Sequence, residues 1–257
     1  MMALQRILPV IVGLAVLAAW EIAVWATGAP RWLIPPPSAI AVALVTDWPV
    51  LLPSLWTTLS ITLSAFALAV IGGTALAVLF TQSRWLEAAL FPYAVVLQVT
   101  PLVAIAPLVV IWVGLDNANR AVLVLALIAA FFPILSNMMI GLRSADLNLR
   151  DLMKLYGASR MQILWRLALP SALPYLTAGM KTAAGLALLG TVVAEFVAGS
   201  GTATGLAWRI VEAGNRLQGP RMFASLVLLS GLGIALWLVL NALERRLLGR
   251  WHESTAR

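Results

Sequence analysis

Residues 121–140 read AVLVLALIAAFFPILSNMMI, a run of 20 residues without a charged side chain. A helix rises about 1.5 Å per residue, so roughly 20 apolar residues cross the hydrocarbon core of a bilayer, which is about 30 Å thick. The run therefore predicts a transmembrane helix. The same criterion predicts six spans in all: Ile7–Ala26, Thr58–Phe80, Ala88–Val113, Ala121–Ile140, Leu173–Ala198 and Met222–Leu243.

The composition of the chain supports a membrane protein. Of its 257 residues, 62% are hydrophobic and 11% are charged, against roughly 45–50% and about 25% in soluble domains. Disorder, a coiled coil and a soluble α/β enzyme are poor interpretations of such a chain. The absence of Cys excludes thiol catalysis and disulfides, and a single His argues against a zinc site, so we expect no metal site.

The net charge of +7 points to cytoplasmic loops rather than to a nucleic-acid surface, because Lys and Arg favour the cytoplasmic side of a membrane. With the N-terminus inside, eleven of these residues lie in cytoplasmic segments and five in external ones, so both termini are predicted in the cytoplasm. The cytoplasmic set is Arg6, Arg84, Arg143, Arg150, Lys154, Arg160, Arg166, Arg245, Arg246, Arg250 and Arg257, and the external set is Arg31, Arg120, Arg209, Arg216 and Arg221.

Two connections outside the predicted spans have a distinct character. Residues 34–38 read IPPPS and cannot continue a helix, because proline fixes φ and lacks an N–H. We expect Ser38 to be the N-cap of a short interfacial helix that runs toward Trp48. The external segment 200–221 is rich in Gly and then amphipathic, so we expect it to lie on the outer surface or dip into it.

The loop 141–170 is the longest predicted cytoplasmic connection. Its apolar residues Leu149, Leu152, Met153 and Tyr156 follow the spacing of an amphipathic helix, and Gly157 is suited to end that helix. Ser159 is then placed to cap a second helix. Such a hairpin either rests on anionic lipid headgroups or docks into a groove on a cytoplasmic partner.

The spacing of this loop is similar to that of the EAA loop of binding-protein-dependent ABC importer permeases. That motif is Glu-Ala-Ala, three residues, Gly, nine residues, and then Ile, one residue and Leu-Pro. Here the corresponding residues are Asp151-Leu152-Met153, Gly157 and Leu167-Ala168-Leu169-Pro170, and the spacing matches throughout. Asp replaces Glu, Leu-Met replaces Ala-Ala, and Leu replaces Ile.

Further segments resemble the nitrate, sulfonate and taurine branch of these permeases, which also includes importers of vitamin precursors such as pyrimidines and riboflavin. These segments are Leu33–Ser38, Pro107-Leu108, Ile111–Gly114, Ala194–Phe196 and Leu243–Leu248. The resemblance implies an all-α polytopic membrane protein of the bacterial inner membrane, with six transmembrane helices and the type I ABC importer permease (MetI-like) fold.

The same resemblance implies the partners and the division of the chain. Residues 1–257 form one transmembrane domain, with a first helix at 7–26, a five-helix permease core at 58–243 and the coupling loop at 141–170. A second copy completes a homodimeric pore in the lipid bilayer, two cytoplasmic ABC ATPase subunits dock on the loops, and a solute-binding protein docks outside. The expected coupling residues are Asp151, Tyr156, Gly157, Met161, Ile163, Leu169 and Pro170.

The chain itself is not expected to be an enzyme or to bind a cofactor, because it lacks a GxxxxGK[ST] phosphate loop. ATP would be hydrolysed by the partner subunit. An ion-coupled secondary transporter is the alternative, but such a carrier would show an inverted repeat or a relay of ionisable residues. A membrane-embedded enzyme is a third possibility, disfavoured because no paired-carboxylate or His cluster is present.

Polar residues within the spans are candidates for a translocation pathway, since burying them in lipid is expensive. Gln98, Thr100 and Pro101 lie midway along the third span, where proline frees backbone carbonyls, so this helix is predicted to line a pore. Glu195 either gates the pore or binds substrate, or it is a structural acid between helices. A close-packing face is predicted on the second span at Thr58, Thr62, Ala65 and Ala69.

The substrate is predicted only by resemblance. The segment 97–104 has Gln98, as vitamin-precursor members tend to have, where sulfonate and taurine members commonly have a basic residue. A neutral or weakly charged heteroaromatic such as a pyrimidine is therefore preferred to a sulfonate, taurine or nitrate.

Overall fold

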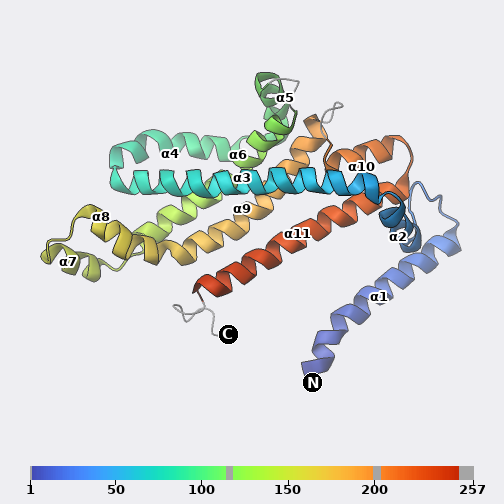
Figure 1. Cartoon of the computed structure of the whole chain (residues 1–257), viewed down its shortest axis with the longest axis horizontal. Coiled ribbons are helices and arrows are strands. Elements are labelled where there is room, and N and C mark those ends of the chain that lie inside the picture. The colour runs from blue at the N-terminus through green and yellow to red at the C-terminus, as the bar shows by residue number, and fades with distance from the viewer. Residues whose placement is uncertain (1, 114–117, 199–203, 249–257) are drawn as a thin grey trace. The chain divides into compact units, whose positions relative to one another are not determined.

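The computed structural model describes residues 2–113, 118–198 and 204–248, with backbone alone for 2–6. All regular elements within these ranges are helices (Figure 1), which confirms the predicted all-α class. Arg250 and Arg257, which contribute to the predicted charge asymmetry, lie outside the described residues.

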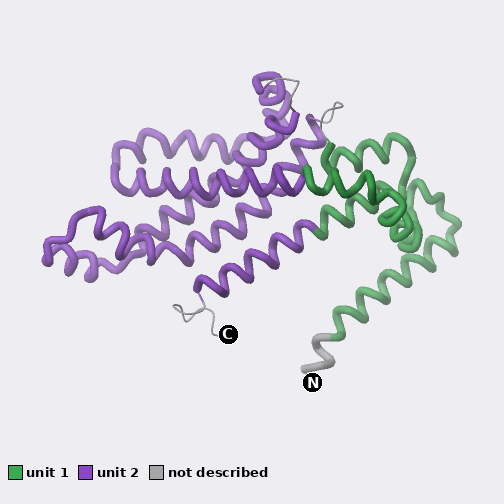
Figure 2. The backbone as a smooth tube through the Cα atoms, in the orientation of Figure 1, with its two compact units in different colours: residues 1–57, 204–231 green, residues 58–203, 232–257 purple. Residues whose placement is uncertain are grey.

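The helices fall into two compact units (Figure 2). Helices α3 and α11 belong in part to each, with the divisions after Thr57 and Gly231. The first unit also contains α1 (Met2–Thr27), α2 (Pro37–Thr46) and α10 (Leu206–Asn215). The second unit contains α4 (Arg84–Val99), α5 (Leu102–Val113), α6 (Ala118–Arg143), α7 (Leu147–Leu155), α8 (Arg160–Ile163), a π-helical turn (Leu164–Ala168) and α9 (Leu169–Ala198).

Among the residues that the structure describes, five helical stretches are long and apolar enough to cross a membrane: Ile7–Thr27, Trp48–Gln82, Ala118–Arg143, Arg160–Ala198 and Gly219–Leu248. A sixth span is formed only if α4 and α5 are counted together, because they are bent by 106°. The predicted third span, 88–113, is therefore not one straight helix. Pro101 lacks an N–H and disfavours a helical conformation in Thr100, which is extended at φ −70° and ψ 124°.

Helices α3 and α11 begin before the predicted starts of their spans, and proline explains both differences. Helix α3 begins at Trp48 and α11 (Gly219–Leu248) at Gly219, ten and three residues before the predicted starts. Pro49 and Pro220 each lie in a first turn, where the missing N–H would have no intrahelical partner. Proline at these positions starts a helix rather than breaking it.

The predicted N-cap of the short second helix is wrong. Helix α2 begins at Pro37, with Pro36 in the cap position and no side-chain cap. The Ser38 hydroxyl instead donates a hydrogen bond to the Glu21 carboxylate at 2.7 Å. Proline is pre-organised for the first helical position, which leaves Ser38 free to join α2 to α1.

The second unit is built on close packing of α6 against α9. A Cβ on Gly141 would lie 2.9 Å from the Ala172 Cα, and one on Gly179 would lie 2.9 Å from the Asn137 Cβ. Glycine at these contacts lets the two backbones approach closely, as in other membrane helix pairs. The predicted close-packing face of α3 is confirmed, because Thr58, Thr62, Ala65 and Ala69 are all buried.

The first unit has a small core of its own. Ile40 and Ala43 of α2 pack with Leu51 of α3 and Ala224 of α11. Beside them the rings of Trp20 and Phe223 meet at a tilt, with centroids 5.9 Å apart. Helix α10 corresponds to the amphipathic segment predicted within 200–221, of which residues 200–203 lie outside the described chain.

Candidate functional site

Helix α7, in the predicted cytoplasmic loop, is stabilised by local contacts rather than by burial. The Asp146 carboxylate caps its N-terminus by accepting a hydrogen bond from the Asn148 N–H at 2.7 Å. Lys154 pairs with Asp151 at 2.9 Å, and both side chains are largely exposed. No residue of α7 is buried. The Asp146 cap was not predicted, although Asp ahead of a periodic apolar segment is a helix-start signal.

A glycine turn ends α7, as predicted. Gly157 has a φ of +77°, which L side chains rarely adopt. Its N–H donates to the Lys154 carbonyl, and the Ala158 N–H donates to the Met153 carbonyl, both at 2.9 Å. This pair of bonds is the Schellman motif, which satisfies the last carbonyls of a helix.

Ser159 begins the next helix through a capping box, which confirms the predicted cap. Its hydroxyl accepts from the Gln162 N–H, while the Gln162 side chain accepts from the Ser159 N–H at 2.7 Å. Helix α8 then passes through the π-helical turn 164–168 into α9. Residues 160–198 are therefore one continuous helical stretch, which the sequence analysis had divided at Pro170.

The predicted coupling residues separate into two groups. Four lie on the exposed surface of the loop: Asp151, Tyr156, Gly157 and Met161. The other three are Ile163, which is half-buried at a cavity wall, Leu169, which packs against a core cluster, and Pro170, which is also exposed and lines a second cavity.

Leu155 joins the exposed group although the sequence analysis did not select it. Its side chain is 85% exposed, the same fraction as that of Tyr156 beside it. Leu155 falls outside the apolar stripe that begins at Leu149, so the periodicity offered no reason to choose it. The two residues together form an exposed apolar tip at the end of α7.

The predicted pathway residues lie at the break between α4 and α5. The Thr100 hydroxyl donates to the Val96 carbonyl at 2.6 Å, which satisfies one carbonyl at the end of α4. Gln98 and Pro101 are exposed on the single chain, and Thr100 is half-buried. Irregular backbone at membrane depth is tolerated only where protein covers it or where it lines water. Because the predicted third span places this break at membrane depth, we expect a neighbour or an aqueous cavity on its exposed side.

Glu195 has a different setting, since only 1% of it is exposed. The Thr58 hydroxyl of α3 donates to its carboxylate at 2.8 Å. One turn away along each helix, the Thr62 hydroxyl donates to Thr191 at 3.1 Å. These contacts join α3 to α9 in the interior of the second unit, and this geometry favours the structural alternative for Glu195.

Among its described residues the first unit contains three ion pairs that were not predicted: Arg221–Asp47, Arg209–Glu212 and Arg216–Glu212. Arg221 donates to both carboxylate oxygens of Asp47, at 2.7 and 2.9 Å, and these bonds lower the pKa of Asp47. A hydrogen bond from Arg209 lowers the pKa of Glu212. The spacing of Arg209 and Glu212 along α10 was enough to predict their pairing. Asp47 and Arg221 are too distant in sequence to be paired without a structure.

The lowered pKa values predict acid sensitivity of the first unit. The unfolded chain takes up protons at the ordinary pKa values of 3.8 for Asp47 and 4.5 for Glu212, before the folded chain does. The stability from these pairs is therefore present above those values and is lost as the pH falls through the lower folded values. We expect the thermal unfolding midpoint in detergent to drop on acidification, and to drop less in Asp47→Asn. An equal drop in both proteins would contradict this assignment.

Within the part of the chain that the structure describes, no group of three His, Asp or Glu side chains could hold a metal ion. The features present are long apolar helices, a sharply bent pair of apolar helices and an exposed helical loop. These features define a multi-pass membrane transport protein. The chain belongs to the family described as binding-protein-dependent transport system inner membrane component, which matches residues 67–249.

Two named relatives and one solved structure extend this assignment. The riboflavin transport system permease protein RibX of Chloroflexus aurantiacus is 37% identical, and the alignment covers 91% of this chain and 86% of the relative. The formylaminopyrimidine transport permease protein ThiX of Halalkalibacterium halodurans is 31% identical, with 95% and 96% covered. The MetNI methionine ABC transporter in inward-facing conformations matches with a TM-score of 0.65 at 19% identity, covering 79% of this chain and 98% of the other.

The chain is thus an ABC importer permease subunit for a small solute, located in the inner membrane as a multi-pass protein. The predicted permease family and MetI-like fold are confirmed. Its relatives are permease subunits rather than ATPases, as expected for this chain. Membership of the family implies an ATPase and a solute-binding protein as partners.

Proposed function

We propose that two copies of this chain form the translocation pathway and that each docks on a cytoplasmic ABC ATPase through α7, the Gly157 turn and α8. The observation that carries this proposal is the exposure of α7, which has no buried residue and ends in the apolar tip Leu155 and Tyr156. An amphipathic helix with an uncovered apolar face is suited to a groove on a partner. The EAA-like spacing of the loop supports the same surface.

The charges of α7 favour a protein partner over lipid headgroups. A helix that rests on anionic lipid needs a cationic polar face. In α7 the exposed Lys154 is paired with Asp151, and the third charged residue, Arg150, is half-buried. The exposed charges therefore cancel, and the apolar tip remains the main feature of this surface.

Aspartate at both tip positions, Leu155 and Tyr156, should abolish co-purification of the ATPase with this chain. A carboxylate forced into an apolar groove loses its hydration without gaining a partner. Leu217→Asp is the matched control, because Leu217 is 62% exposed and lies on the predicted external side. The measurement is the ATPase content of the detergent-purified complex, and an undiminished content in the tip variant would contradict the docking proposal.

We propose that the second copy of the chain lies beside the break between α4 and α5. Gln98 and Pro101 are exposed there, and lipid does not satisfy irregular backbone. A homodimer would cover one side of this break and leave the other facing a shared aqueous path. Gln98, Thr100 and Pro101 are then pathway residues, while Glu195 holds α3 against α9 behind them.

The proposed solute is a neutral or weakly charged heteroaromatic such as a pyrimidine. Gln98 offers an amide donor and acceptor without a charge, which suits such a ring better than a sulfonate. The relatives named for riboflavin and formylaminopyrimidine transport support the same class. Ligand binding by the solute-binding protein encoded beside this gene tests the class, and tight binding of a sulfonate or nitrate would reject it.

A further inference from the structure

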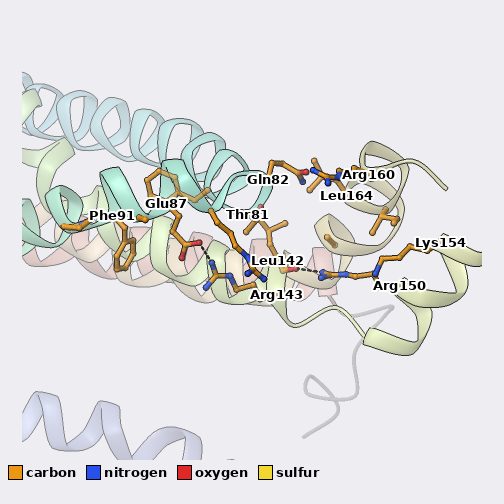
Figure 3. A pocket seen from close by; sticks show the side chains of 16 residues that line it. Thr81, Gln82, Glu87, Phe91, Leu142, Arg143, Arg150, Lys154, Arg160 and Leu164 are labelled. Atoms are coloured by element: carbon orange, nitrogen blue, oxygen red, sulfur yellow. Dashed lines mark hydrogen bonds and ion pairs between the residues drawn. The ribbon is translucent and has the colours of Figure 1, made fainter. Parts of the chain in front are cut away.

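A basic cavity of about 870 Å³ lies on the side of the second unit that carries the coupling loop. Its walls come from the turn between α3 and α4, the end of α6, and helices α7 and α8 with the π-helical turn (Figure 3). Five cationic side chains line it, from four different helices: Arg84, Arg143, Arg150, Lys154 and Arg160. Glu87 is the single acidic residue of the lining.

The cavity is lined by more cationic side chains than there are acidic side chains to pair with them. Arg143 pairs with Glu87, and Lys154 pairs with Asp151, which is not part of the lining. Arg84, Arg150 and Arg160 form no ion pair among the residues that the structure describes. The cavity therefore presents three uncompensated guanidinium groups to whatever occupies it.

Arg150 supplies an independent indication of a ligand. One of its terminal nitrogens reaches the Leu142 carbonyl at 3.4 Å (Figure 3), while its Nε is buried with no hydrogen-bond partner among the described residues. A buried donor without a partner costs free energy that a bound acceptor would recover. An anionic oxygen in the cavity is the acceptor that a guanidinium prefers.

Beside Thr81 and Gln82, part of the cavity lining is apolar, which favours an amphiphile over a small inorganic ion. Ala88, Phe91, Pro92 and Ile163 are exposed or half-buried there and offer apolar surface, while Phe80 and Leu142 are buried in the hydrophobic cluster behind them. An inorganic phosphate would leave this wall unused, whereas an acyl chain would cover it.

Two exposed tryptophans on the elements that line the cavity support a position at the level of lipid headgroups. Trp85 follows Arg84 at the start of α4, and Trp165 lies in the π-helical turn. Their side chains are 86% and 66% exposed. Exposed Trp side chains at helix ends are typical of the membrane–water interface, and basic pockets between membrane helices on the cytoplasmic side bind anionic headgroups.

We propose that this cavity binds the phosphate of an anionic phospholipid, with Arg84, Arg150 and Arg160 around the phosphate and an acyl chain against Ala88, Phe91 and Pro92. The lipid joins the turn between α3 and α4 to α7 and α8, so its binding stabilises the position of the coupling loop.

The test is thermal unfolding of the purified permease in detergent, titrated with short-chain phosphatidylglycerol, short-chain phosphatidylcholine or inorganic phosphate. We expect phosphatidylglycerol alone to raise the unfolding midpoint. Replacing Arg150 and Arg160 with Gln should weaken its apparent affinity at least about tenfold, as expected for the loss of charge-assisted hydrogen bonds. Arg160→Gln alone provides the same test with an exposed residue whose replacement leaves the core intact.

The matched control is Arg245→Gln with Arg246→Gln, which removes two exposed cations from the last turn of α11 outside the cavity. Unchanged lipid affinity in the cavity variants, or an equal loss in the control, would overturn the proposal. An equal response to inorganic phosphate would overturn the lipid as the source of the phosphate. Loss of the ATPase from the cavity variants with lipid affinity intact would assign these arginines to the ATPase instead.

Discussion

Gly157→Val should uncouple ATP hydrolysis from solute uptake, lowering uptake at least about tenfold while the assembled importer still hydrolyses ATP. An ordinary L residue in a left-handed conformation costs about 1–2 kcal/mol, and a β-branched residue is less tolerant still. Gly157 has a φ of +77°, and a Cβ there would meet no atom within 4 Å. The effect therefore comes from the backbone of the turn, which would change the direction of α7 relative to α8.

Gly157→Asn is the matched control for this prediction, because Asn tolerates the left-handed conformation better than other residues. The importer is reconstituted with its ATPase and solute-binding protein, and both uptake and ATP hydrolysis are measured. Asn should retain most of the coupling that Val loses. Normal uptake in the Val variant would show that the turn does not transmit the motion.

Gly179→Val should destabilise the second unit by about 3 kcal/mol, toward the upper end of the range for overpacked cores. Its Cβ would lie 2.9 Å from the Asn137 Cβ and 3.1 Å from the Pro133 carbonyl oxygen. Neither atom can move without shifting the backbone of α6. We expect a large fall in the unfolding temperature and in the yield of monodisperse protein.

The control for this substitution lies in the same helix. A Cβ on Gly185 would meet no atom within 4 Å, so Gly185→Val introduces the same residue without a clash. Both variants are compared by thermal unfolding in the same detergent. Equal stability of the two would refute the close approach of α6 and α9 at Gly179.

The spans could be predicted because each depends on a property of the sequence alone, the length of an uncharged apolar run. Their ends were less predictable, since Pro49 and Pro220 occur in first turns where proline is favoured. The bend at Pro101 could be anticipated as a break in the third span, whereas its angle of 106° depends on packing of α5 against α6 and α9.

The coupling loop was predictable for a related reason. Gly157 and Ser159 act on neighbours within five residues, so their spacing fixes the turn and the cap. The burial of Glu195 depends on Thr58, more than a hundred residues away. The arginines of the basic cavity likewise come from four helices. No short sequence pattern predicts such a cluster, because its members are far apart in the chain.

Helix α8 continues into α9 through the π-helical turn, so residues 160–198 form one helical segment about 58 Å long. Near its midpoint lie Gly179, pressed against α6, and Lys181, which is ion-paired with Glu244 of α11. If residues 160–198 tilted as a rigid helix about these contacts, a tilt of about 5° would move each end by about 2.5 Å in opposite directions. A displacement of the chain at Arg160 would then be accompanied by a displacement in the opposite direction at Glu195.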